Sequence, residues 1–140
     1  QFWKRAGRFE GWYYFETERR AFAEWLVAQR MEGVVFLSGD RHFSELLRIE
    51  RPDAYPLHEF TSSPLTSRPP ARLDAADRDN PDVVAGTQVA RRQFGLIRVT
   101  GPGDDRRLAL ESYDSAGTLL WRHELRVSDL RFPRRPGTGK

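Results

Sequence analysis

The sequence contains no cysteine and no long apolar run, and these two absences exclude several classes of protein. Without cysteine the chain has no disulfide, no thiolate zinc site and no cysteine nucleophile, so any metal must bind through histidine and carboxylate side chains. The longest apolar runs have four residues, whereas a membrane-spanning helix needs about 20. We therefore expect no membrane-spanning segment and no membrane partner.

A strong excess of basic charge is also missing from most of the chain. The net charge of +3 is the difference between 23 basic and 20 acidic residues. Residues 131–140 carry four of the bases and no acid, so residues 1–130 have 19 bases, 20 acids and a net charge of −1. Nucleic-acid-binding domains concentrate basic side chains on one face, commonly with stacking aromatics. We therefore expect no nucleic-acid partner and interpret 131–140 as a basic, flexible tail.

The length and the apolar content together favour one globular domain. A chain of 140 residues is close to the usual domain size, and 39% apolar residues can form a core. We expect this domain to occupy residues 1–130.

Apolar residues at helical spacing predict a helix over residues 18–30, with Thr17 as its N-cap. Gly33 suits the position after a helix, and the apolar run over 34–37 predicts a strand buried on both faces. A helix followed by a buried strand is an αβ unit, in which ligands collect beyond the carboxyl end of the strand. The fold class is therefore predicted to be α/β.

The rest of the chain divides into further strands and one long loop. Residues 62–92 are rich in Ser, Pro, Asp and Arg, which predicts a long loop that acts as a lid or binding loop or is disordered, with room for a short helix over 83–90. The last three strands should form an antiparallel meander. The predicted strands cover residues 46–49, 57–61, 94–100, 107–113 and 118–127.

Asp40 and His42 are the strongest candidates for chemistry. They follow the predicted strand over 34–37, and Gly39 permits a tight loop that aims an oxygen and an imidazole ligand into one crevice. The alternative is that Asp40 caps backbone amides in a turn beside a surface histidine. Glu45 is a candidate for a side chain that orients His42, whereas His58 and His123 are interpreted as structural.

Several ordered motifs resemble the C-terminal part of the alkaline phosphatase D (PhoD-like) family, within the calcineurin-like metallophosphoesterases. The central motif is Ser-Gly-Asp-Arg-His at 38–42, inside the longer matching stretch 34–46. The other matching segments are Gly11-Trp12, Glu18-Arg19, residues 59–66, Gln93-Phe94-Gly95 and the closing hairpin through Asp114 and Gly117.

The resemblance implies the C-terminal half of an α/β/β/α sandwich that hydrolyses phosphate mono- or diesters with a two-metal site. By this resemblance Asp40 binds Ca²⁺ and His42 binds Fe³⁺, a division that suits a hard oxygen ligand and an imidazole. It also implies a periplasmic or secreted location. Arg41 is a candidate catalytic residue that offers a forked donor to a phosphate oxygen, although strand-like alternation would as readily point it away.

The family's remaining metal ligands come from upstream motifs that these 140 residues lack. Asp40 and His42 leave each metal with one protein ligand, whereas Ca²⁺ takes 6–8 oxygens and catalytic zinc sites use three protein ligands. We therefore expect the chain to be inactive alone. It is interpreted as a C-terminal fragment that needs the N-terminal half of its domain, or as a degenerate relative. The alternative from another class is a non-catalytic, β-rich interaction module.

Overall fold

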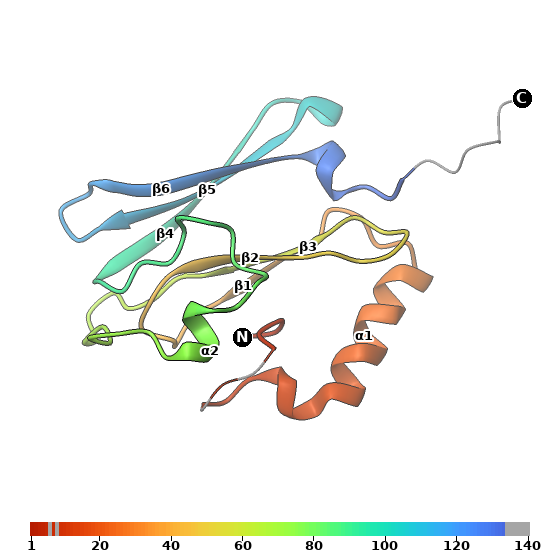
Figure 1. Ribbon diagram of the computed structural model, residues 1–140. Helices are drawn as coiled ribbons and strands as arrows, with labels where there is room; N and C mark the ends of the chain where they lie inside the picture. The colour runs from red at the N-terminus through yellow and green to blue at the C-terminus, as the bar shows by residue number, and fades with distance from the viewer. Residues whose placement is uncertain (6, 8, 134–140) are drawn as a thin grey trace, which may run out of the picture.

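The computed structural model describes residues 1–5, 7 and 9–133, and in this part of the chain it shows a mixed α/β fold with two three-stranded sheets (Figure 1). The elements, in chain order, are the 3₁₀ helix η1 (Trp12–Phe15), α1 (Glu16–Ala28), β1 (Val35–Ser38), β2 (Glu45–Ile49), β3 (Leu57–Thr61), α2 (Ala75–Arg78), β4 (Gln93–Thr100), η2 (Gly103–Asp105), β5 (Arg107–Asp114), β6 (Leu119–Arg126) and η3 (Val127–Leu130).

The first sheet has the strand order β1-β3-β2 and mixes two kinds of pairing. β1 runs parallel to β3, with Leu37 beside Phe60, whereas β2 runs antiparallel to β3, with Leu46 beside Phe60. Because β1 and β3 are parallel, their carboxyl ends lie at the same edge of the sheet. This edge carries the loop that contains Asp40 and His42.

The second sheet is the antiparallel meander β4-β5-β6, as predicted. The tight turn between β5 and β6 is held by Asp114, whose side chain accepts hydrogen bonds from the backbone N–H groups of Ala116 and Thr118. Gly117 provides the positive φ of this turn, at 84°. Turn chemistry that was visible in the sequence therefore sets the register of this hairpin.

The central strand β3 packs against a different layer on each of its faces. On one face, the ring of Phe60 lies 5.0 Å from that of Trp121, and His58 lies 6.3 Å from His123, both on β6. On the other face, Glu59 points toward the N-terminal segment. In Figure 1 the first sheet accordingly lies between α1 on one side and the meander on the other.

Glu59 fastens the N-terminal segment to the sheet. Its fully buried carboxylate accepts hydrogen bonds from the backbone N–H of Phe2, at 2.9 Å, and of Trp3, at 2.7 Å. The Trp3 ring then packs edge-on against Phe36 of β1, with centroids 5.3 Å apart. Two charge-assisted bonds thus place the aromatic N-terminal residues in the core.

Two local predictions in the first αβ unit are corrected. The helix begins at Glu16, with Phe15 in the N-cap position and no side-chain cap, so Thr17 lies inside the first turn. The strand β1 is buried on one face only, because it is the edge strand and the meander leaves Leu37 57% exposed.

Residues 82–89 of the 62–92 segment pack along the edge of β2. Isolated bridges join Ser44 to Val89 and Leu47 to Val83, and the helix in this segment is α2, so the predicted helix over 83–90 is wrong. Residues 83–90 use their backbone groups to pair with β2, and Gly86, with a φ of 83°, interrupts any helix there.

The start of the predicted tail is part of the fold. Phe132 is buried, its ring lies 5.5 Å from that of Tyr55, and Arg131 pairs with Asp104. Residues 134–140 of the predicted tail lie outside the described residues. None of the described helices is both long and apolar enough to cross a membrane.

The buried histidine between the sheets predicts a loss of stability in mild acid. Burial, with help from nearby His123 and Arg48, lowers the pKa of His58 to about 4 from an ordinary value of 6.5. The unfolded chain therefore binds a proton below pH 6.5 that the folded chain takes up only near pH 4. The free energy of unfolding should fall by about 3 kcal/mol over this window and change little with His58 above pH 7.

Urea unfolding between pH 4 and pH 7 measures this dependence. His58→Gln should flatten the profile even if it lowers the stability at pH 7, whereas His123→Gln should flatten it less. Equal slopes for the wild-type chain and His58→Gln would refute the assignment. Asp129 and Glu124 border the same cavity and are unchanged in all three proteins, so they form a shared background.

Candidate functional site

The candidate site is the loop that leaves β1, where two of the sequence motifs meet. The backbone N–H of Ser62 donates to the carbonyl of Ser38 at 2.9 Å, which extends the parallel pairing by one residue. Beyond it, the N–H of His42 donates to Oγ of Ser63 at 2.7 Å. The Ser-Gly-Asp-Arg-His motif and the 59–66 motif are therefore adjacent in space, although about 20 residues separate them in the chain.

The imidazole of His42 is held by a single hydrogen bond with a defined direction. Its Nδ1 lies 3.0 Å from the backbone carbonyl oxygen of Arg68. A carbonyl oxygen can only accept, so Nδ1 carries the proton, and the Nε2 lone pair of the neutral ring is available to a ligand. Metal-binding histidines commonly donate their other ring N–H to a backbone carbonyl in this way.

Asp40 and His42 border the same cavity, which has a volume of about 350 Å³. Asp40 is exposed, so its carboxylate stays hydrated and has no desolvation penalty. The other lining residues are Phe9, Glu10, Arg41, Arg68 and Pro70. The structure thus brings together the two residues predicted as metal ligands and adds Glu10, a second acidic side chain.

The backbone of this loop has an uncommon conformation at both candidate ligands. The φ angles of Asp40 and His42 are 66° and 60°, in the left-handed region. A non-glycine residue in this region costs on the order of 1–3 kcal/mol and persists where its surroundings enforce it, most often at functional sites.

Arg41 points into a buried ion pair. Its Nη2 donates to Oδ2 of Asp77 at 2.6 Å, and its side chain is only 6% exposed. Asp77 thus engages Nη2, whereas Nε and Nη1 have no hydrogen-bond partner among the described residues, and Arg41 also borders the cavity beside His42.

The predicted contact between Glu45 and His42 is wrong. The buried carboxylate of Glu45 accepts hydrogen bonds from the side chains of Gln1, at 2.7 Å, and Gln88, at 3.1 Å. Burial raises its pKa, although both hydrogen bonds act to lower it. Glu45 begins a strand whose first side chain points to the N-terminal segment, and Arg68 takes the role of orienting His42.

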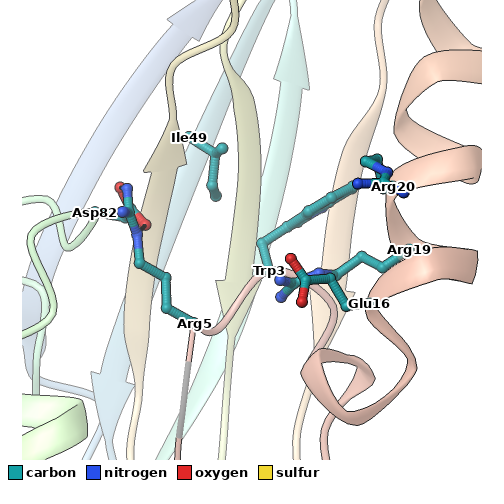
Figure 2. Close-up of a pocket in the computed structure, with 7 residues that line it drawn as sticks. All are labelled: Trp3, Arg5, Glu16, Arg19, Arg20, Ile49 and Asp82. Atoms are coloured by element: carbon teal, nitrogen blue, oxygen red, sulfur yellow. Dashed lines mark hydrogen bonds and ion pairs between the residues drawn. The ribbon is translucent and has the colours of Figure 1, made fainter.

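A larger cavity, of about 430 Å³, lies between the N-terminal segment and α1, and Figure 2 shows the residues that line it. Its charged groups are largely committed to other parts of the protein. Arg5 makes two hydrogen bonds to Asp82, and Arg19 donates to the backbone carbonyl of Lys4. This cavity contains none of the candidate metal-binding or catalytic residues, so the smaller cavity beside His42 is the better candidate site.

The donor atoms present fit a metal site only in part. An aspartate oxygen and an imidazole nitrogen are suitable ligands for Ca²⁺ and for iron, respectively. Among the described residues, however, no group of three or more His, Asp or Glu side chains is arranged to hold an ion. Asp40 and His42 can therefore contribute to a site whose other ligands lie elsewhere.

Comparison of the chain with protein-family models, curated proteins and solved structures finds no match. The resemblance to PhoD-like phosphatases therefore rests on the sequence motifs alone.

Because the backbone of Asp40 is left-handed, we predict that removing the Asp40 side chain will not destabilise the fold. Asp40→Gly should keep or raise the free energy of unfolding, whereas Asp40→Ala should leave the chain about 1 kcal/mol less stable than the glycine variant, because a Cβ is unfavourable at positive φ. Urea denaturation of both variants measures this difference. Equal stability of the two would contradict the backbone conformation described for the loop.

Proposed function

We propose that this chain supplies Asp40 and His42 to the two-metal centre of a PhoD-like phosphoric ester hydrolase. The observation that carries the proposal is the hydrogen bond from Nδ1 of His42 to the Arg68 carbonyl, which leaves Nε2 available at the cavity shared with Asp40. A turn that merely capped its own backbone would have no need to fix the tautomer of a neighbouring histidine. The substrate class is phosphate mono- or diesters.

The position in the fold supports the same assignment. The loop lies beyond the carboxyl ends of two parallel strands, which is where open α/β sheets bind their ligands. Within this loop, the two left-handed residues are also the two candidate ligands, as expected where backbone strain serves a site.

In the proposed centre, the carboxylate of Asp40 would hold Ca²⁺ and the imidazole of His42 would hold Fe³⁺. The metal pair supplies Lewis-acid activation of a water and of the phosphoryl oxygens. The chain's own residues do the positioning: Arg68 keeps the imidazole in the Nδ1–H tautomer, and Ser63 holds the backbone of His42. The exposed carboxylate of Asp40 borders the same cavity as His42 and would be available to a metal there.

The remaining ligands must come from outside the described residues. Glu10 also borders the cavity, but among the described residues it does not complete a three-ligand group with Asp40 and His42. We therefore propose that further segments, in a longer chain or in a partner, supply the other ligands, and that this chain has no hydrolase activity alone.

Substitution of the two ligands in the whole protein that contains this chain tests the proposal. Asp40→Gly and His42→Gln should each reduce the hydrolysis of p-nitrophenyl phosphate or bis(p-nitrophenyl) phosphate at least about 100-fold, because each removes a ligand of a metal that activates the water. Elemental analysis of the purified proteins should show a matching loss of iron for His42→Gln and of calcium for Asp40→Gly.

Asp53→Gly is the matched control for Asp40→Gly. Asp53 is also exposed and also has a left-handed φ, of 55°, but it lies in the turn before β3, at the opposite edge of the sheet. Its substitution should leave activity and metal content unchanged. Full activity and metal content in both ligand variants would overturn the enzyme assignment and favour the interaction module instead.

A further inference from the structure

Arg41 lies between the two candidate ligands and is the anchored residue of their loop. Asp40 is exposed, whereas the side chain of Arg41 is 6% exposed. Its guanidinium carbon lies 5.3 Å from the centre of the Phe9 ring and 5.7 Å from that of Phe43. Because Asp40 and His42 both have left-handed backbones, fixing the residue between them restricts both of their side chains.

Asp77 of α2 is the ion partner that holds Arg41 in place. Oδ2 of Asp77 accepts from Arg41, and Oδ1 pairs with the ammonium of Lys4, whose side chain is 2% exposed. Nε and Nη1 of Arg41 are buried and have no hydrogen-bond partner among the described residues. Without Asp77, two buried cations would face each other with no compensating charge.

Asp77 is itself fixed by its surroundings. Its backbone N–H donates to the side chain of Asp74, which caps α2, and its backbone carbonyl accepts a hydrogen bond from Gln88. The same side chain of Gln88 also donates to Glu45 of β2. Through Gln88, the backbone of Asp77 is thus tied to β2 at Glu45, which lies 32 residues before it in the chain.

We propose that Asp77 is a positioning residue for the metal-ligand loop and acts through Arg41, an inference that rests on the proposed function. A buried ion pair contributes little net stability compared with apolar groups of similar size, whereas it fixes the direction of a guanidinium. In this arrangement Asp77 fixes Arg41, Arg41 fixes the loop backbone, and the loop keeps Nδ1 of His42 on the Arg68 carbonyl.

The test separates positioning from stability with three variants. Asp77→Asn removes the charge and keeps the shape. A triple variant, Lys4→Met with Arg41→Met and Asp77→Leu, replaces the whole buried cluster by apolar side chains and should recover any stability that Asp77→Asn loses. Asp79→Asn, on an exposed acid that pairs with Arg78 next to α2, is the control.

The first readout is the tautomer of His42, measured at pH 7.5 by long-range ¹H–¹⁵N NMR on the chain described here. The wild-type chain and Asp79→Asn should show His42 mainly as the Nδ1–H form. In Asp77→Asn and in the triple variant, the ratio of the Nδ1–H to the Nε2–H form should fall about tenfold, because the ring leaves the Arg68 carbonyl. Broadening of the His42 signals by added Mn²⁺ should weaken in parallel.

A stably folded triple variant with the wild-type His42 tautomer ratio would overturn the positioning role, even if Asp77→Asn fails to fold. These outcomes are distinguishable from failure of the proposed function. Unchanged activity in Asp40→Gly and His42→Gln would show that the hydrolase assignment is wrong. If the tautomer ratio still depends on Asp77 in that case, the role of Asp77 in positioning His42 is nevertheless supported.

Discussion

The parallel pairing of β1 with β3 is the constraint on which the rest of the candidate site depends. It places the exit of β1 beside the exit of β3, and the bond from the N–H of Ser62 to the Ser38 carbonyl continues the ladder to the point where both strands end. With antiparallel pairing, the two motifs would lie at opposite edges of the sheet. His42 could then not reach Ser63 and Arg68, and the cavity beside Asp40 would lose one wall.

The same central strand explains why so many polar groups are buried in a small protein. All five residues of β3 are buried, so each polar side chain needs a partner in the layer that it faces. Glu59 uses its carboxylate to bind the backbone of the N-terminal segment, and Thr61 bonds to Ser38 and Gln1. His58 stays neutral between the sheets, where burial lowers its pKa. The polar residues thus join the layers, while Leu57 and Phe60 supply apolar burial.

The regular elements were predictable because their signals are local. Apolar alternation and the turn residues located β3 and the meander to within about two residues, and the helical spacing located α1. The same logic failed for β1, because burial on both faces depends on which strand becomes the edge, and a local apolar run carries no such information. The segment over 83–90 was misassigned for a related reason, since its backbone pairs with a strand about 40 residues away.

The residues of the candidate site were likewise predictable only in part. Asp40 and His42 stand next to a strand end and could be found from the motif, whereas their restraints come from Arg68 and Asp77, which have no fixed spacing to the motif. The energies show why such distant restraints are needed. Two left-handed residues cost on the order of 1–3 kcal/mol each, and one hydrogen bond contributes only about 1 kcal/mol net. The contact of His42 with Ser63 is therefore too weak to hold the loop alone. An anchored Arg41 makes up the difference, because any relaxation of the loop would have to move a buried cation off its only carboxylate partner among the described residues.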